Sequence, residues 1–539
     1  MTVDYERMRR LMAEALGLRP DLIQKGSNFF DMGGDSFSAQ HLVSRARDEG
    51  VYLTMEDIFD HPTWSDFVRI VGEKAANASR ASQSPHRNTG SEDHFRNLDG
   101  KIGDGFVAIY PTTDFQRFAL FSMYFRYFRI PLPSTIDRAR LLGACQQLVK
   151  RHESLRTAFY AYTDGGQEKV VQGILPPKDI QFKERNEAAS SLDQYCEDDN
   201  RKTLEPPVDG KPPFQAHLVT LQDSSMFLVL RFTHAQWDGV SLASIAHDLT
   251  ALYNGSLVPP ASQFIDHARA AWASQTEEAY EIWRQLLRGS KMTVLRGHQL
   301  AVDGAKSTNG ITADEPYTVQ ITKNIPLPVL PANISMATLV KAAWAIVLRR
   351  LFIPRTSTVC KQDDLDDVVF GQVTNARGLE IPHDESIVGP CANIVPVRVH
   401  FTETMTKLDL FHQVQRQYVR TRPAENVEFG KIVKHCTSWP SGTRYGSFVR
   451  FQNYDFSPTS WFNGVPCKGS LYNLPNRPSE TANLAVFPLD TRLSLQLTVS
   501  HLTLSQKEAD FVVNKFCNVV QYLGTGLQST IASSFELLN

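Results

Sequence analysis

One histidine of this sequence stands where an imidazole could do acid–base chemistry. Residues 226–231 form a short, mostly apolar run with a β-branched and an aromatic residue, which is typical of a buried strand. An Asp-Gly turn and a helical pattern over 241–254 come next, after the stretch Phe232-Thr233-His234-Ala235-Gln236-Trp237-Asp238-Gly239. Neutral imidazole accepts protons near pH 7, so His234 is a candidate base, although a lone histidine is more often structural. Asp238, four residues later, shapes the same turn.

A serine near the N-terminus lies in a second place suited to chemistry. The sequence Asp31-Met32-Gly33-Gly34-Asp35-Ser36 is followed by apolar residues at helical spacing, which predicts a helix that begins near Ser36. The free N–H groups and the dipole of a helix N-terminus stabilise a phosphate dianion. Asp35 or Ser36 would equally serve as an ordinary helix cap. Ser36 is therefore a candidate for carrying a phosphate group, with capping as the alternative.

The elements that position these residues belong to more than one domain. A chain of 539 residues is longer than one hydrophobic core can organise. Its polar, Ser/Asn/Arg-rich stretch lacks periodicity and predicts a flexible linker over 76–104, after a helical domain over 1–75. The alternating strand and helix patterns over 105–539 predict α/β lobes.

The composition excludes several classes of function. The 56 basic and 58 acidic residues nearly balance, so nothing indicates binding to nucleic acid or to an anionic membrane. No apolar run is long enough to span a bilayer, and no signal peptide opens the chain. The seven cysteines have no zinc or CxxC spacing, so we expect reduced thiols, no metal site and a cytoplasmic location. A Gly-x-Ser-x-Gly elbow and a Walker-type phosphate loop are also missing.

The motif around Ser36 resembles the attachment motif of thiolation (peptidyl carrier) domains of nonribosomal peptide synthetases. The resemblance extends over about the first 75 residues and includes Phe29-Phe30 before the motif and His61-Pro62-Thr63 after it. It implies a small all-α, four-helix carrier domain. It also implies that a phosphopantetheinyl transferase attaches 4′-phosphopantetheine to Ser36, so that the thiol of the arm holds a peptide as a thioester.

Most of residues 105–539 resemble the condensation domains of the same synthetases. The family pattern His-His-x-x-x-Asp-Gly is matched by His234, Asp238 and Gly239, with Thr233 in place of the first histidine. Further similar segments are Arg151-His152-Glu153-Ser154-Leu155-Arg156, Val388-Gly389-Pro390-Cys391-Ala392-Asn393 and Phe448-Val449-Arg450-Phe451-Gln452-Asn453. The resemblance implies an α/β fold of two chloramphenicol-acetyltransferase-like lobes, 105–275 and 276–539, with the catalytic His234 in a tunnel between them.

The departures from this pattern resemble the terminal condensation-like domains of fungal synthetases. Those domains release their product by macrocyclisation, and they often have a small hydroxyl residue at the position of Thr233 and an aromatic residue at that of Trp237. If the natural chain ends at Asn539, we expect this domain itself to release the peptide supplied by upstream modules. Enzymes of the fumiquinazoline and tryptoquialanine type, which make anthranilate-containing tripeptide alkaloids, are the nearest specific comparison.

Several roles and alternatives follow from the resemblance. Asp238 is expected to form an ion pair with Arg377 that holds the active-site turn, together with Gly239. Asn393 and Trp237 are candidate substrate contacts, with local backbone bonding and packing as the respective alternatives. The competing functions are bimolecular condensation with a second carrier, epimerisation, a non-catalytic recruiting module and simple hydrolysis.

Overall fold

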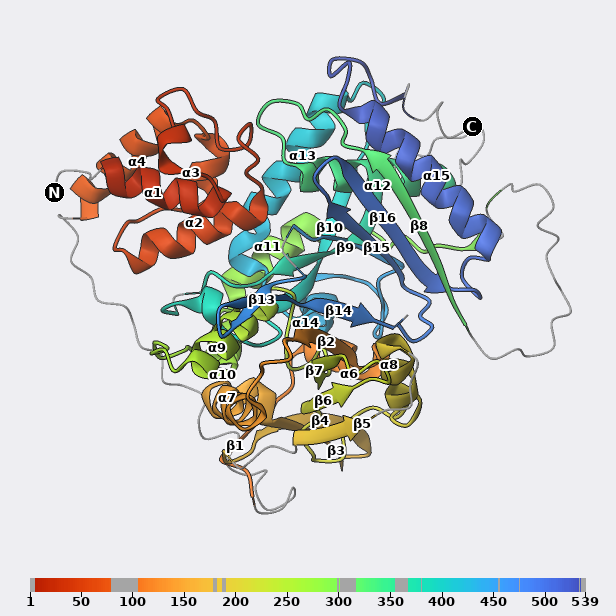
Figure 1. Ribbon diagram of the computed structural model, residues 1–539. Helices are drawn as coiled ribbons and strands as arrows, with labels where there is room; N and C mark the ends of the chain where they lie inside the picture. The colour runs from red at the N-terminus through yellow and green to blue at the C-terminus, as the bar shows by residue number, and fades with distance from the viewer. Residues whose placement is uncertain are drawn as a thin grey trace, which may run out of the picture.

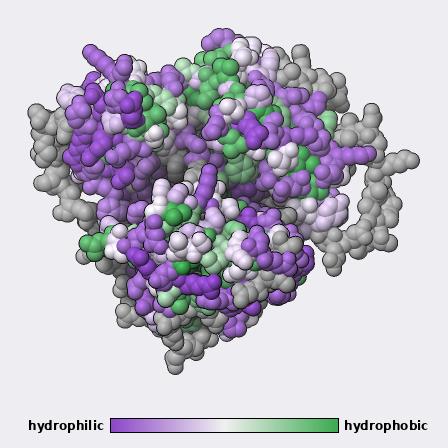
Figure 2. Space-filling view, in the orientation of Figure 1, coloured by the Kyte–Doolittle hydropathy of each residue, from purple (hydrophilic) through white to green (hydrophobic). Residues whose placement is uncertain are grey.

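The computed structural model describes residues 5–78, 105–177, 182–186, 191–297, 300, 317–353, 367–379, 381–453, 456–474, 476–532 and 534. These residues form a small helical domain at the N-terminus and a larger two-lobed domain (Figure 1). Within the predicted linker, residues 79–104 lie outside the described residues. Hydrophilic side chains cover most of the helical domain on the face shown in Figure 2.

The helical domain is held together by one apolar cluster that all of its α-helices share. Its elements are α1 (Tyr5–Leu16), η1 (Pro20–Leu22), α2 (Ser36–Asp48), α3 (Met55–Asp60) and α4 (Trp64–Ala78). Apolar residues at helical spacing converge on this cluster, among them Met8, Leu11, Leu42, Ile58 and Phe67. Thr54 and Asp57 form a capping box that starts α3. The prediction of a four-helix domain is confirmed.

The N-terminal lobe consists of two sheets with helices around them. Its five-stranded sheet has the order β14-β2-β7-β6-β5, in which β14 (Ser470–Asn473) comes from the C-terminal half of the chain, and a three-stranded sheet has the order β1-β4-β3. The strands are β1 (Ala108–Pro111), β2 (Arg126–Leu132), β3 (Thr157–Asp164), β4 (Gln167–Ile174), β5 (Phe182–Asn186), β6 (Gln215–Thr220) and β7 (Met226–Phe232). The helices are α6 (Asp114–Ser122), α7 (Arg138–Arg151), α8 (Leu192–Arg201), α9 (Ser241–Asn254) and α10 (Phe264–Ala273).

The C-terminal lobe has a six-stranded sheet of order β10-β9-β11-β15-β16-β8. Its strands are β8 (Thr318–Pro326), β9 (Asp367–Asn375), β10 (Ala392–His400), β11 (Ser447–Phe451), β15 (Ala482–Pro488) and β16 (Arg492–Ser500). Its helices are α11 (Glu277–Leu287), α12 (Met336–Phe352), α13 (Lys407–Thr421), α14 (Phe429–Cys436) and α15 (Gln506–Leu523).

The central strands of this sheet are covered by helices on both faces. Val368 and Phe370 of β9 pack with α12, α13 and α15, whereas Val369 between them packs with α11 and α14. Side chains of a strand alternate between faces, so a strand covered on both sides is apolar at nearly every position. The continuous apolar run of β9 from Val368 to Phe370 has this cause.

Part of the C-terminal half returns to the N-terminal lobe, which the predicted division at residue 275 does not anticipate. The strands β12 (Thr459–Phe462) and β13 (Val465–Lys468) form a hairpin, and β14 (Ser470–Asn473) pairs antiparallel with β2. A contact between strands more than 300 residues apart has no local signature in the sequence. The two lobes are therefore joined by shared strands as well as by the chain between α10 and α11.

The six cysteines among the described residues are buried and unpaired. Among the helices that the structure describes, none combines the length and the apolar character needed to cross a bilayer.

Candidate functional site

His234 lies in the turn that follows β7 and precedes α9, with its ring held in one orientation. Its Nδ1 atom is 2.8 Å from the carbonyl oxygen of Trp237. Because a carbonyl oxygen can only accept, Nδ1 carries the hydrogen and Nε2 keeps its lone pair. The ring stacks on the Trp237 indole at a centroid distance of 4.6 Å, and the ring of Phe115 meets it edge-on at 5.5 Å. The structure gives Nε2 no hydrogen-bond partner among the described residues.

The surroundings of His234 favour its neutral form. Burial, and next the positive charge of Arg126, lower the pKa of His234 to about 4. The imidazole is therefore neutral at pH 7 and has a free lone pair on Nε2. This is the state that can accept a proton or a hydrogen bond from an incoming N–H group.

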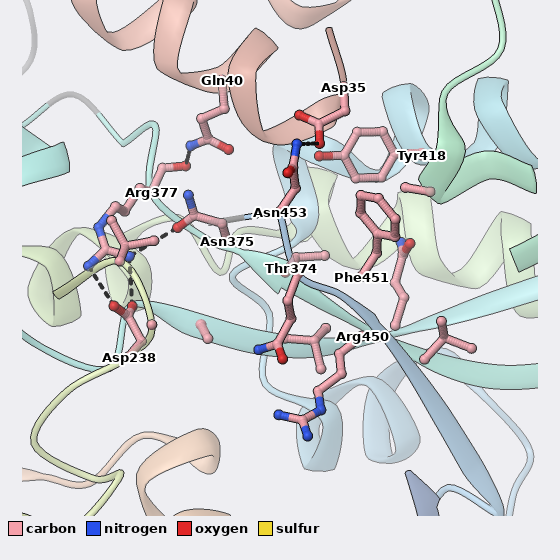
Figure 3. A pocket seen from close by; sticks show the side chains of 18 of the residues that line it. Asp35, Gln40, Asp238, Thr374, Asn375, Arg377, Tyr418, Arg450, Phe451 and Asn453 are labelled. Carbon is pink, nitrogen blue, oxygen red and sulfur yellow. Dashed lines mark hydrogen bonds and ion pairs between the residues drawn. The ribbon is translucent and has the colours of Figure 1, made fainter. Parts of the chain in front are cut away.

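Asp238 links the two lobes through a buried ion pair with Arg377. Arg377 Nη1 lies 2.6 Å from Asp238 Oδ2, and Nη2 lies 3.1 Å from Oδ1. The carboxylate also accepts hydrogen bonds from the Ser241 hydroxyl (2.8 Å) and the Cys391 backbone N–H (3.0 Å). The ion pair expected from the sequence is thus present, and it is bidentate. The Asp238 carboxylate points at Arg377 (Figure 3).

The loop that follows β9 carries Arg377 and is contacted directly by the helical domain. Gln40 of α2 donates to the backbone carbonyl of Arg377. Arg47 of α2 donates to the carbonyl oxygens of Leu379 (2.5 Å) and Ile381 (2.9 Å). Asp384, which has no exposed surface, accepts from the Gly378 N–H (2.6 Å) and also pairs with Arg47 (3.3 Å). This loop therefore contacts both the helical domain and the turn that holds His234 and Asp238.

A pocket of about 110 Å³ lies between the helical domain and the turn that contains Asp238 and Gly239. We call it the interdomain pocket. Asp35 lies at one end, where Asn453 Nδ2 donates to it (2.8 Å), and Asp238 lies toward the other end (Figure 3). Further lining residues are Gln40, Gly239, Lys341, Gln372, Thr374, Asn375, Arg377, Tyr418, Arg450, Phe451 and Gln452.

Ser36, the predicted attachment site, is the first residue of α2 and directly follows Asp35 in the pocket wall. Gly239 lines the same pocket beside Asp238. The structure thus brings three of the predicted site residues, Asp238, Gly239 and Arg377, to one pocket. Ser36 is next in the chain to the lining residue Asp35, and His234 belongs to the same turn as Asp238.

The two predicted substrate contacts have other surroundings. Asn393 Nδ2 donates to the carbonyl oxygens of Glu425 (2.7 Å) and Val427 (3.1 Å), so both of its N–H groups are used within the protein. The structure favours the local-backbone interpretation of Asn393 over substrate binding. Trp237 is only 1% exposed, and its ring and carbonyl group support His234. Trp237 therefore has the surroundings of a packing residue and not those of a substrate contact.

The sequence reasoning did not identify Lys341 and Gln40 in the wall of the interdomain pocket, or Arg47 of α2 beside the loop after β9. Lys341 had a recognisable signal, because it is a single charge inside the otherwise apolar run over 336–348. Gln40 and Arg47 had none, since a polar helix face next to a glycine turn is usually solvated. Their partners lie more than 330 residues away in the sequence.

Two family models match this chain. Residues 115–478 match the model described as "Condensation domain", and residues 6–71 match the one described as "Phosphopantetheine attachment site". Among curated proteins, the nonribosomal peptide synthetase chyA of Penicillium rubens is 40% identical over 561 residues, covering 99% of this chain and 23% of that protein. The synthetase fmqA of Aspergillus fumigatus is 28% identical over 530 residues, covering 97% of this chain and 13% of that protein. The chain thus spans less than a quarter of either relative.

Solved structures share the fold. The crystal structure described as "holo T3CT" has a TM-score of 0.68 and 27% identity, and the match covers 83% of this chain and 100% of that one. The starter condensation domain of rhizomide synthetase RzmA has a TM-score of 0.60 and 17% identity, and the match covers 79% of this chain and 98% of that one.

Breaking the lobe-spanning ion pair should destabilise the protein. Asp238→Ala leaves the buried Arg377 guanidinium without its carboxylate, and we expect a loss of about 3–5 kcal/mol in the free energy of unfolding. Urea titration followed by tryptophan fluorescence measures this loss, and Asp490→Ala, on an exposed turn, is the control. A variant that unfolds like the parent but has lost activity would refute the structural role of Asp238.

Loosening the contact between α2 and the loop after β9 should be visible at Gly378. Arg47→Ala removes hydrogen bonds to two carbonyl oxygens and to Asp384, so the Gly378 amide should exchange its hydrogen about tenfold faster. Hydrogen–deuterium exchange with mass spectrometry checks this, with Arg69→Ala on the exposed side of α4 as the control. Unchanged exchange in the Arg47 variant would mean that α2 does not support the loop.

Proposed function

Since the chain belongs to the condensation domain family and has a phosphopantetheine carrier domain ahead of the condensation domain, we propose that the two domains together release a carrier-bound peptide by intramolecular amide formation. The peptide's own amine attacks its thioester carbonyl, a C–N bond forms, the C–S bond breaks, and the thiol takes up the proton that the amine loses. The observation that carries this proposal is the interdomain pocket, which runs from Asp35, next to Ser36, to the turn that holds His234.

The carrier domain carries 4′-phosphopantetheine covalently on Ser36. The residues of this chain suit such an arm, because Ser36 begins a helix directly after the pocket-lining Asp35, and the Thr374 hydroxyl in the pocket wall is buried with no hydrogen-bond partner among the described residues. When bound, the arm supplies a thiol that holds the peptide as a thioester. Side chains of the condensation domain orient the amine that attacks this thioester.

His234 acts on the attacking amine through Nε2. The Trp237 carbonyl fixes the hydrogen on Nδ1, so Nε2 is the atom that accepts the amine's hydrogen. Because the pKa of His234 is lowered to about 4, the imidazole is a weak base. Orientation of the amine by a hydrogen bond to Nε2 is therefore the larger part of its role, above all for a neutral aryl amine.

A second pocket, which Phe115 lines, supports intramolecular attack rather than condensation with a second carrier. This Phe115 pocket measures only about 30 Å³. At its rim, Asp114 accepts from the Gly430 N–H (3.2 Å) and Lys431 donates to Gln275 (2.7 Å), so the two lobes are bridged there. A second carrier would need an entrance of its own for its aminoacyl arm. A peptide that enters through the interdomain pocket and folds back needs none.

Holding both ends of one peptide near each other supplies the main rate advantage. Well-oriented intramolecular reactions gain on the order of 7–11 kcal/mol at best. The resemblance to fungal terminal domains, based on Thr233 and Trp237, favours an anthranilate-containing tripeptide as the substrate. Upstream modules would assemble this peptide, and a phosphopantetheinyl transferase would attach the arm.

The release assay tests this function directly. The protein is loaded at Ser36 with an anthraniloyl-tripeptidyl pantetheine, and the products are identified by mass spectrometry. We expect a product one water lighter than the linear acid, formed about 100-fold or more slowly by His234→Ala. The matched control is His412→Ala on α13, which should release product at the parent's rate.

Other outcomes of the same assay point to the alternatives. A linear acid formed at equal rates by the parent and by His234→Ala indicates hydrolysis. Peptide that stays on the carrier until a second aminoacylated carrier is added indicates bimolecular condensation. Peptide that is never released by the parent indicates a non-catalytic module.

The pH dependence follows from the lowered pKa of His234. Protonation of Nε2 removes the lone pair that receives the amine's hydrogen, so activity is lost as the pH falls through the pKa of the folded protein. With an aryl amine as the nucleophile, we expect the single-turnover rate to stay level from about pH 8 to about pH 5 and to fall toward pH 4. An inflection near the ordinary histidine pKa of about 6.5 would contradict the neutral, buried state of His234.

A further inference from the structure

The row of side chains on one face of β9 changes from apolar to polar where it enters the interdomain pocket. Val368 and Phe370 are fully buried beneath α12. The next two residues on that face are Gln372 and Thr374, which are 4% and 5% exposed. Buried polar side chains destabilise a fold unless they find partners, so this change requires an explanation.

Lys341 faces this polar row from α12. It is 6% exposed and lines the interdomain pocket, and its Nζ donates to Gln372 Oε1 at 2.9 Å. The ammonium also lies 4.7 Å from the centre of the Tyr418 ring. An ammonium has three N–H groups, and the contacts given by the described residues include no carboxylate. Burial lowers the pKa of Lys341 to about 7, as expected for a desolvated amine without a counter-ion.

Thr374 is the second underused polar group of the pocket wall. Its Oγ1 is buried and has no hydrogen-bond partner among the described residues. Such orphaned hydroxyls are uncommon in native proteins. A lysine and a threonine with unused donors, in the wall of one pocket, fit a ligand with neutral hydrogen-bonding groups along its length.

The carrier domain closes the pocket from the side on which such a ligand would arrive. Asp35 accepts from Asn453 at one edge, and Phe59 of α3 lies 6.0 Å from the Tyr418 ring at another. Tyr418 therefore contacts the carrier domain on one side and the Lys341 ammonium on the other. The ligand that enters at Asp35 and Ser36 is the arm of the carrier domain itself.

We propose that Lys341 and Thr374 are positioning residues that bind the amide groups of the pantetheine arm. The arm has two amides, whose carbonyl oxygens accept from Lys341 Nζ and from the Thr374 hydroxyl. These bonds set how far the thioester reaches toward the turn of Asp238 and Gly239. The inference rests on the proposed function only in that the arm enters the interdomain pocket, and it is independent of whether release is cyclising.

The protection of the arm's thiol tests this proposal without any turnover. The holo protein is treated with iodoacetamide, and alkylation of the arm is followed by mass spectrometry of the Ser36 peptide, with urea-unfolded protein as the unprotected reference. Lys341→Met and Thr374→Val should each be alkylated about five- to tenfold faster than the parent, as expected for one lost hydrogen bond. Thr374→Ser keeps the hydroxyl and should retain the parent's protection. Lys323→Met, on β8 outside the pocket, is the matched control.

Thermal unfolding of each variant separates loss of binding from loss of fold. If Lys341→Met does not fold, the comparison of Thr374→Val with Thr374→Ser decides the question alone. Folded variants that are alkylated at the parent's rate overturn the proposal, and so does a parent arm as reactive as in unfolded protein.

The release assay on the same proteins keeps the two hypotheses apart. Cyclic product from a parent whose thiol protection does not depend on Lys341 or Thr374 leaves the proposed function standing and this inference refuted. If thiol protection depends on both residues but the product is linear or absent, this inference stands and the proposed function is refuted.

Discussion

The buried ion pair between Asp238 and Arg377 is the interaction on which the rest of the site depends. Asp238 follows β7 of one lobe and Arg377 follows β9 of the other, so the pair fixes the spacing of the lobes beside the turn that holds His234. Taking two charges out of water is costly, and such a pair often adds little net stability. Here every oxygen of the carboxylate has further N–H or O–H donors, from Ser241 and Cys391. Its contribution is therefore geometric, since only one arrangement of the two lobes satisfies it.

The loop after β9, which contains Arg377, also contacts the carrier domain. The carbonyl oxygen of Arg377 accepts from Arg422 (2.6 Å) and from Gln40, and Asp384 ties the loop to Arg47. These contacts are polar and involve few large apolar side chains, apart from Phe59 near Tyr418. Interfaces of this kind resemble transient ones. When the carrier domain is bound, the loop after β9 therefore contacts both the helix that begins at Ser36 and the turn that holds His234.

The sequence was sufficient to predict what depends on local pattern. The strand before His234, the helix that begins at Ser36 and the four-helix domain follow from periodicity and turn residues, and the partner of Asp238 followed from the family pattern. Long-range pairing was not predictable, as the return of β14 to β2 illustrates, because no local preference encodes it. Asn393 was ambiguous for a related reason. An amide side chain serves substrate and backbone equally well, and only the fold shows that two carbonyl oxygens already accept from it.

The burial of His234 has two opposing consequences, and their balance indicates the kind of acyl group for which the site is suited. Burial keeps the imidazole neutral, with Nε2 available, but the lowered pKa of about 4 also makes it a weak base. Because such a weak base takes little of the nucleophile's proton, it can pass little on to a leaving group that must be protonated, as in the cleavage of an amide. A thiolate leaves with little acid assistance, so a thioester needs from the protein mainly the orientation of the amine and the exclusion of water. The imidazole, held by the Trp237 carbonyl and stacked on its ring, has the fixed position that the proposed orienting role requires, and the buried surroundings that weaken it as a base are also those that the proposed exclusion of water requires.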